Sequence, residues 1–175
     1  IIDDQPIASP IARDDLTGLL MRSTLVHQLD CELKKPYLRD NFLAVCFIDL
    51  DGFKEINDQY GHLAGDAALV AVANRIKECV RDSDTISRVG GDEFIVLLPA
   101  VMSEHDAISV ANKILRVIEV PVEFEGSSLN TSASVGIALY PDHGQDEVEL
   151  VNHADVAMYA AKTSGKNAIK VYGDT

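Results

Sequence analysis

The pattern of apolar and polar residues divides this chain into segments with two different periods. Four long stretches repeat apolar residues at helical spacing, as Leu69, Val72 and Ile76 do. Shorter apolar runs that are rich in β-branched and aromatic residues indicate strands. The pattern predicts helices over 14–35, 66–80, 103–120 and 146–163, some helix within 51–65, and strands over 41–50, 85–89, 93–98, 122–124, 129–140 and 168–172.

Local signals mark several ends of these elements. Pro36 stops the first helix, Ser103 is placed to cap the N-terminus of the helix over 103–120, and Gly165 ends the last helix. Residues 1–12 show little periodicity and contain two prolines. We therefore interpret them as a linker that precedes a single domain over 13–175.

The order of these elements belongs to the α+β class. A strand, a helix, a two-stranded hairpin, a helix and a strand follow one another, which is the β-α-β-β-α-β core of a ferredoxin-like fold. The chain adds a helix before this core, and a hairpin, a helix and a strand toward its C-terminal end. We expect a largely antiparallel sheet with helices covering one face. The almost continuous apolar run over 41–50 indicates a central strand that is buried on both faces.

Composition and charge narrow the class of protein. The 175 residues suffice for one domain with a full core. The net charge of −13 argues against a surface for a nucleic-acid polymer, which would be basic. A nucleotide substrate is still compatible with this charge, because metal ions bridge acidic groups to phosphates.

The cysteines and the apolar runs bear on location. Cys31, Cys46 and Cys79 lack paired spacing, which favours a reducing, cytoplasmic compartment, and Cys46 is interpreted as a core residue. No apolar run has the length of a membrane span, so we expect no membrane contact by this segment. Because the chain begins at Ile1 rather than Met, we expect it to be part of a longer protein. This expectation is compatible with a membrane anchor outside the present segment.

Acidic residues gather where two apolar strands end. Asp49 and Asp51 lie at the end of the first strand, and they face the same side because side chains alternate along a strand. A Gly90-Gly91 turn is followed directly by Asp92 and Glu93. If the two strands are neighbours, these oxygens form a site for Mg²⁺ or Mn²⁺, and two such ions can stabilise the attacking and leaving oxygens at phosphorus.

Turn formation offers a simpler explanation of the same residues. Aspartate favours turns, and for Asp51, which precedes Gly52, this explanation is at least as good. It is weaker for Asp92 and Glu93, because the two glycines alone suffice for the turn. Spacing along the chain leaves open whether the two acidic groups meet.

Several motifs in a fixed order resemble one known family. Over residues 13–172 the sequence is similar to the GGDEF domain of diguanylate cyclases, with a departure at Met21, where that family usually has Asn. The matching motifs are Asp15-Leu16-Thr17-Gly18-Leu19, Phe47 through Asp58, Gly61-His62, Gly65-Asp66, Arg88 through Phe94, Ser134-Val135-Gly136-Ile137-Ala138, Ala154-Asp155, Met158-Tyr159, Lys162 and Gly165-Lys166-Asn167.

The resemblance implies the nucleotidyl cyclase palm fold and a reaction in which two GTP condense to cyclic di-GMP and two pyrophosphates. Each 3′-hydroxyl attacks the α-phosphorus of the other nucleotide. The resemblance also implies two Mg²⁺ (or Mn²⁺) ions per active site. Their implied ligands are Asp49, the Leu50 carbonyl, Asp92 and Glu93, and either of the last two can deprotonate the hydroxyl. Phosphate contacts are implied for Lys54, Lys162, Lys166 and the backbone around Phe53.

The same resemblance implies residues that read the base. A carboxylate at Asp66 can accept from N1–H and N2–H of guanine, and Asn57 can both donate and accept. Without the resemblance, Asn57 capping a turn and Asp66 capping the next helix would be the preferred explanation. His62 fits either the nucleotide pocket or a structural position beside Gly61.

A further four-residue motif precedes the hairpin. Arg81 and Asp84 match the inhibitory RxxD motif of the family, in which the arginine and the aspartate bind the product. The alternative is a solvated turn at the end of a helix, where arginine also suits the helix dipole.

The sequence therefore predicts a diguanylate cyclase domain with product inhibition by cyclic di-GMP. Each domain binds one GTP, so turnover requires a homodimer. The alternative from a different class is a catalytically silent module that senses GTP or cyclic di-GMP and regulates a neighbouring domain. A different palm-type cyclase or polymerase is disfavoured by the implied base readers.

Overall fold

The structure is a computed structural model that describes residues 11–35 and 40–174. The predicted linker over 1–12 lies almost entirely outside the described residues, and so does Pro36. The helices and strands of the described chain, in order, are β1 (Leu20–Met21), α1 (Arg22–Leu33), β2 (Phe42–Asp51), α2 (Phe53–Tyr60), α3 (His62–Cys79), β3 (Thr85–Gly90), β4 (Glu93–Val101), α4 (Glu104–Ile118), β5 (Val122–Phe124), β6 (Ser127–Leu129), β7 (Ser132–Tyr140), α5 (Glu147–Thr163) and β8 (Ala168–Val171).

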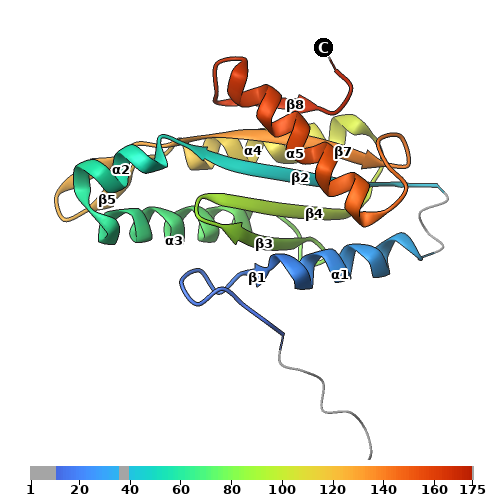
Figure 1. The fold of residues 1–175 in the computed structure, drawn as a ribbon, viewed down its shortest axis with the longest axis horizontal. Coiled ribbons are helices and arrows are strands. Elements are labelled where there is room, and N and C mark those ends of the chain that lie inside the picture. Colours follow the sequence, from blue (N-terminus) through green and yellow to red (C-terminus); the bar gives the residue numbers. More distant parts are fainter. Residues whose placement is uncertain (1–10, 36–39, 175) are drawn as a thin grey trace, which may run out of the picture.

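One sheet carries the fold, with the strand order β1-β3-β4-β2-β7-β8 (Figure 1). Strand β2 pairs antiparallel with β4 on one side and with β7 on the other, and β3 pairs antiparallel with β4. The edge strand β1 pairs in parallel with β3, and the edge strand β8 pairs in parallel with β7. The inner four strands, connected by α2–α3 and by α4, are the β-α-β-β-α-β core expected from the sequence.

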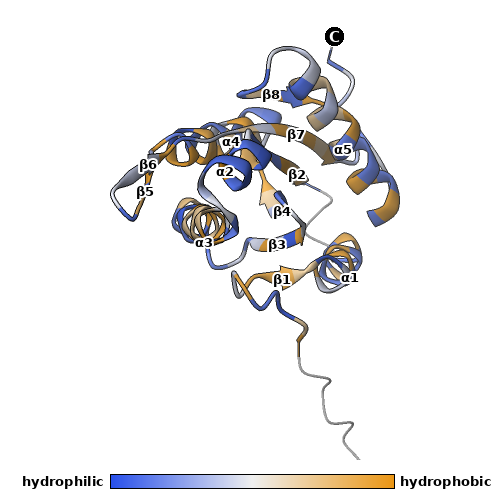
Figure 2. Cartoon of the chain, turned by 60° about the vertical axis from the view of Figure 1, so that its left-hand side comes forward, coloured by the Kyte–Doolittle hydropathy of each residue, from blue (hydrophilic) through white to orange (hydrophobic). Residues whose placement is uncertain are grey.

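Helices cover both faces of this sheet, so the expectation of one covered face is wrong. Residues of α3 and α4 pack on one face with Ala44, Cys46 and Ile48 of β2. Residues of α1 and α5 pack on the other face with Val45 and Phe47. Both sets of side chains along β2 are apolar, so each face needs a cover. Figure 2 shows the hydrophobic character of the central strand β4 between these layers.

The first helix begins later than its leucine spacing predicts. The Asp14 carboxylate accepts hydrogen bonds from the backbone N–H of Thr17 (2.8 Å) and from its hydroxyl (2.6 Å). Gly18 adopts a positive φ of 73°, which a helix does not allow. A closed turn therefore replaces the predicted helix over these residues, and α1 begins at Arg22.

Other boundaries differ less. The helix predicted from Asp66 begins four residues earlier, at His62, and the strand predicted over 129–140 is divided into β6 and β7. Ser103 caps α4 as predicted, by accepting from the N–H of Asp106. Cys46 is fully buried, as predicted, and burial raises the pKa of its thiol to about 12. None of the helices in the described part of the chain is both long and apolar enough to cross a membrane.

Candidate functional site

The end of β2 and the glycine turn between β3 and β4 meet at one rim of the sheet. The N–H of Leu50 donates to the carbonyl of Asp92 at 3.1 Å. In the ladder between β2 and β4, Asp49 lies directly opposite Glu93. The approach of the two acidic groups, which the spacing left open, is therefore present in the fold.

A guanidinium fixes the glycine turn. Arg88 donates through Nε and Nη2 to the carbonyl of Gly91, at 3.1 and 2.9 Å. Its Nη1 forms an ion pair with Asp14 Oδ1 at 2.9 Å, although the two residues are 74 positions apart. The N-terminal turn is thus tied to the loop that presents Asp92 and Glu93.

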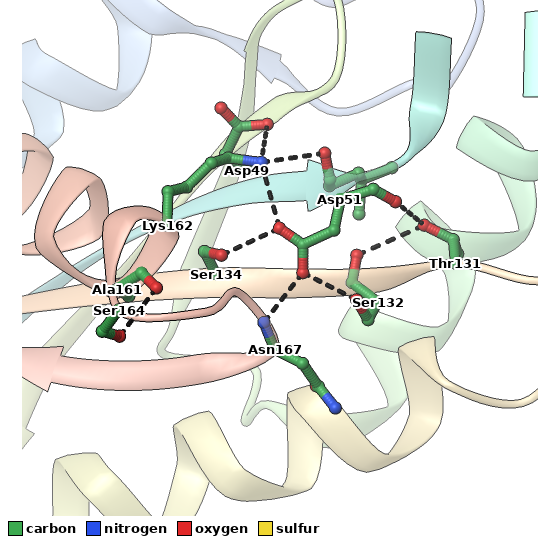
Figure 3. A network of polar contacts seen from close by, with 10 residues as sticks. Asp49, Asp51, Thr131, Ser132, Ser134, Ala161, Lys162, Ser164 and Asn167 are labelled. Atoms are coloured by element: carbon green, nitrogen blue, oxygen red, sulfur yellow. Dashed lines mark hydrogen bonds and ion pairs between the residues drawn. The ribbon is translucent and has the colours of Figure 1, made fainter. Parts of the chain in front are cut away.

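Helix α5 brings a lysine to the same rim. It crosses β7 at Gly136, where an added Cβ would overlap the backbone of Ala154 and Met158. Only glycine allows the helix to lie this close to the strand. The last turn of α5 then places Lys162 over the end of β2 (Figure 3).

The Lys162 ammonium has three oxygen partners on β2. It lies 3.2 Å from Asp49 Oδ1, 3.0 Å from Asp51 Oδ1 and 3.2 Å from the carbonyl oxygen of Leu50. Two of these oxygens, those of Asp49 and Leu50, are the ones that the resemblance assigns to a metal ion.

Asp51 is a buried acceptor in a network, and the interpretation as a simple turn residue does not describe it. Its Oδ1 accepts from the Ser134 hydroxyl at 2.8 Å, and its Oδ2 accepts from the Ser132 hydroxyl at 2.6 Å (Figure 3). The backbone N–H of Asn167 donates to Oδ2 at 3.0 Å. Burial works to raise the pKa of this carboxyl, but the hydrogen bonds outweigh it and lower the pKa.

Sequence reasoning missed this network because its partners come from distant parts of the chain. Ser132 and Ser134 lie opposite Asp51 and Asp49 in the register between β2 and β7. The available signal was two serines at alternate positions of an otherwise apolar strand, which places both hydroxyls on one face.

Burial and, after it, neighbouring negative charges raise the pKa values of two carboxyls at this rim. Burial, followed by the charge of Asp92, raises the pKa of Asp49 to about 6, against the lowering effect of Lys162. Burial, Asp155 and Asp92, in that order, raise the pKa of Glu93. Both carboxyls therefore lie where additional positive charge is stabilising.

The donor set at this rim suits a hard cation. Among the described residues, no three His, Cys, Asp or Glu side chains are grouped closely enough to hold a metal by themselves. A carboxylate oxygen of Asp49 and the Leu50 carbonyl nevertheless converge on one positively charged group, the Lys162 ammonium. Carboxylate and carbonyl oxygens are the ligands that Mg²⁺ prefers, and Mg²⁺ usually takes few carboxylates. The residues present therefore fit the implied ion.

Most of the predicted nucleotide contacts lie on the two helices that follow β2, and Lys162 and Lys166 lie at the end of α5 and in the loop after it. Helix α2 begins with Phe53 and Lys54, directly after Gly52. Asn57 lies on the same helix, and an added Cβ on Gly65 of α3 would overlap its Oδ1. The Asn57 amide of α2 therefore lies against the backbone of α3 at Gly65. His62 and Asp66 lie in this same part of α3.

These residues differ in exposure. Lys54, His62 and Asp66 are exposed, and Asn57 is half-buried. Lys166 is exposed in the loop after α5, where its φ is +66°. The structure thus brings Asp49, Leu50, Asp92, Glu93 and Lys162 together, and it places the other predicted nucleotide contacts on adjoining segments.

The predicted inhibitory pair lies at the other end of β3. The backbone N–H of Arg81 donates to Asp84 Oδ2 (2.8 Å), and the guanidinium Nη2 of Arg81 donates to the carbonyl of Ala100 (3.0 Å). The Arg81 side chain is 65% exposed, whereas the Asp84 side chain is 2% exposed. Asp84 Oδ1 is buried without a hydrogen-bond partner among the described residues. The six residues of β3 separate this pair from the glycine turn by roughly 20 Å.

Comparison with known proteins gives a consistent result. The family model for "Diguanylate cyclase, GGDEF domain" matches residues 11–168. The bifunctional diguanylate cyclase/cyclic di-GMP phosphodiesterase MucR of Pseudomonas aeruginosa is 46% identical over 154 residues, which are 88% of this chain and 22% of MucR. The diguanylate cyclase TpbB of the same species is 41% identical over 167 residues, which are 95% of this chain and 38% of TpbB.

A solved structure of the GGDEF domain of TpbB from Pseudomonas aeruginosa has the same fold. It superposes with a TM-score of 0.89 at 41% identity, covering 92% of this chain and 94% of that one. The chain thus spans well under half of MucR or of full-length TpbB, but almost all of the isolated domain.

Proposed function

Because this chain belongs to the GGDEF domain family of diguanylate cyclases, we propose that it condenses two GTP molecules into cyclic di-GMP, a bacterial second messenger, and two pyrophosphates. In each step the 3′-hydroxyl of one GTP attacks the α-phosphorus of the other, and pyrophosphate leaves. The observation that carries this proposal is the joint placement of Asp49, Asp92 and Glu93 at one rim, with Lys162 above them.

This family uses divalent metal ions, and the rim oxygens suit them. Asp49, the Leu50 carbonyl, Asp92 and Glu93 would hold Mg²⁺ or Mn²⁺, two ions per active site. Bound there, such ions supply positive charge to the phosphate and lower the pKa of the attacking hydroxyl.

The protein's own groups perform the remaining tasks. A carboxylate of the Asp92-Glu93 pair accepts the proton of the 3′-hydroxyl. Lys54 at the start of α2 and Lys162 at the end of α5 bind phosphate oxygens and stabilise the charge of the leaving pyrophosphate. The N–H groups around Phe53 and the exposed Lys166 add weaker phosphate contacts.

Base selection falls to the α2–α3 segment. Asp66 accepts from N1–H and N2–H of guanine, and Asn57 donates to and accepts from the base edge. Adenine lacks this donor pair, so it leaves the Asp66 carboxylate without its partners. His62 lies in the same turn and lines the nucleotide pocket in this proposal.

Two further parts of the proposal concern partners. One domain holds one GTP, so two domains must face each other as a homodimer during turnover. Arg81 and Asp84 bind the product, which then inhibits the enzyme; this part of the proposal is supported by Asp84 Oδ1, which is buried without a hydrogen-bond partner among the described residues. The location that we propose for this domain is the cytoplasm.

A turnover assay across protein concentration tests the proposal. The chain is incubated with GTP and Mg²⁺, and cyclic di-GMP and pyrophosphate are separated by chromatography. The rate per domain should rise with protein concentration, because the active species is a dimer.

Asp92→Ala is the matched variant for this assay. It should reduce turnover about 10²–10³-fold, the order of loss seen when a group that stabilises the transition state is removed, while circular dichroism stays unchanged. Near-normal product formation by this variant would contradict the assignment of the rim. Nucleotide binding without turnover by the parent protein, at any concentration, would favour the sensing module instead.

A further inference from the structure

Asp51 is the most completely bonded carboxylate at the rim, yet the resemblance gives it no role. Asp51 is buried, with 6% of its surface exposed. Among the described residues, four groups donate to its carboxylate: the hydroxyls of Ser132 and Ser134, the N–H of Asn167 and the Lys162 ammonium. A buried carboxylate needs such partners. One of them is Lys162, the lysine that we propose to bind phosphate.

The pattern of donors fixes the direction of the carboxylate. Oδ2 is bound by Ser132 and by the backbone of Asn167, which come from β7 and from the loop before β8. Oδ1 is bound by Ser134 and then points to Lys162 at 3.0 Å. Because donors on two sides hold it, the carboxylate cannot rotate away from the ammonium.

The other two partners of Lys162 are shared with the proposed cation. Asp49 Oδ1 and the Leu50 carbonyl both contact the ammonium at 3.2 Å, and both belong to the donor set that fits a divalent ion. Asp51 is the one partner of the three that this set does not include. A lysine stem has several rotatable bonds, so an ammonium without a fixed acceptor is poorly positioned.

We propose that Asp51 is a positioning residue that holds the Lys162 ammonium at the phosphates of the bound nucleotide. This inference rests on the proposed function only in assuming that the rim binds a guanine nucleotide. It predicts that Asp51 affects nucleotide binding through Lys162 and by no other route.

The competing role for Asp51 is structural. The carboxylate joins β2 to β7 and to the loop before β8, so its loss could weaken the fold without acting on Lys162. The two roles differ in one measurable respect. A purely structural residue affects nucleotide binding to the same degree whether or not Lys162 is present, and a positioning residue does not.

The test is a double-mutant cycle on binding, with no turnover involved. The dissociation constant of the α,β-methylene analogue of GTP is measured by calorimetry with Mg²⁺ for the parent, Asp51→Asn, Lys162→Met and the double variant. We expect Asp51→Asn and Lys162→Met each to weaken binding about 10-fold, the size of one charge-assisted hydrogen bond. We expect the double variant to bind no more weakly than Lys162→Met alone.

Asp146→Ala is the control for damage to α5. Asp146 caps the N-terminus of this helix by accepting from the N–H of Glu149 at 2.8 Å, at the end opposite Lys162. Its loss should lower the melting temperature and leave analogue binding within twofold of the parent. A weakening by Asp146→Ala equal to that by Asp51→Asn would assign the effect to helix stability and overturn the proposal.

The remaining outcomes are also decisive. Equal, additive losses in the double variant, or unchanged binding by Asp51→Asn, overturn the positioning role even if the parent makes cyclic di-GMP. A parent that binds no analogue overturns it as well. Coupled losses in a parent that makes no cyclic di-GMP support the positioning role and contradict only the proposed reaction.

Discussion

The guanidinium of Arg88 connects the N-terminal turn at Asp14 to the glycine turn between β3 and β4. Arg88→Met keeps the apolar stem and removes the ion pair to Asp14 and both hydrogen bonds to the Gly91 carbonyl. The side chains of Arg88 and Asp14 are 17% and 18% exposed, so this pair is shielded from water on most sides. A hydrogen bond to a charged group contributes about 1.5–3 kcal/mol, in contrast to the smaller value of a surface pair.

We expect Arg88→Met to lower the free energy of unfolding by about 2–3 kcal/mol at pH 7. For a chain of this length, about 1 kcal/mol corresponds to roughly 2–4 °C, so the melting temperature should fall by roughly 4–12 °C. The assay is thermal and urea unfolding followed by circular dichroism. Turnover should fall as well, because the loop that carries Asp92 loses its anchor at Gly91.

The effect on stability should depend on pH in a defined direction. Burial works to raise the pKa of Asp14, but hydrogen bonds from Thr17 and the charge of Arg88 outweigh it, and the folded-state pKa lies below 3.8. A carboxyl with a lowered pKa stabilises the fold above its unfolded value, and this contribution is lost as the pH falls through the folded pKa. The difference between the parent and Arg88→Met should therefore be full from neutral pH down to about pH 5 and should shrink below the unfolded value of 3.8.

Asp14→Asn is the matched control for this prediction. An amide at this position removes the charge that faces Arg88 and keeps an oxygen that can accept from Thr17. In a double-mutant cycle the two substitutions should be coupled, because each removes the same ion pair. Equal melting temperatures for the parent and Arg88→Met at pH 7, or a difference that grows below pH 3.8, would contradict a stabilising role of this ion pair.

Two other substitutions test the proposed product site and the proposed reading of the base by Asn57. Arg81→Ala should raise the concentration of cyclic di-GMP needed for half-inhibition at least about 10-fold, as expected for the loss of a charge-assisted contact, and an inhibition curve equal to the parent's would exclude Arg81 from the product site. Gly65→Ala adds a methyl group that overlaps Asn57 Oδ1, so the displaced amide should raise KM for GTP about 10-fold and reduce selectivity against ATP; an unchanged KM in steady-state assays would show that Asn57 does not read the base.

The sequence was sufficient for those features that depend on neighbouring residues. The β3–β4 hairpin follows from its glycine pair, and the cap of α4 follows from Ser103. The central position of β2 follows from its apolar run. The site residues on β2 and on the glycine turn were predicted as two separate groups, and their meeting depended on the pairing of β2 with β4.

Features that depend on competition or on distant contacts could not be predicted. Leucines at helical spacing before Arg22 predicted helix, but the hydrogen bonds of Asp14 to Thr17 favoured a turn, which is a competition that spacing alone does not resolve. The network around Asp51 joins it to residues 81 and 116 positions away, so no local pattern contains it. Its detection required the register of β7 against β2.

The charge at the rim favours the binding of a cation there. Taken by themselves, the carboxylates of Asp49, Asp51, Asp92 and Glu93 and the Lys162 ammonium have an excess of three negative charges if all are ionised, and among the described residues Asp155 and Arg22 also act on Glu93, with opposite signs. The excess is not spread evenly, since hydrogen bonds satisfy Asp51 and lower its pKa, whereas Asp49 and Glu93 have raised pKa values. The unsatisfied charge therefore lies on the side of Asp49 and Glu93, where the glycine turn arrives. A divalent ion bound there would relieve the repulsion between strands β2 and β4 and should stabilise the folded domain in the absence of nucleotide.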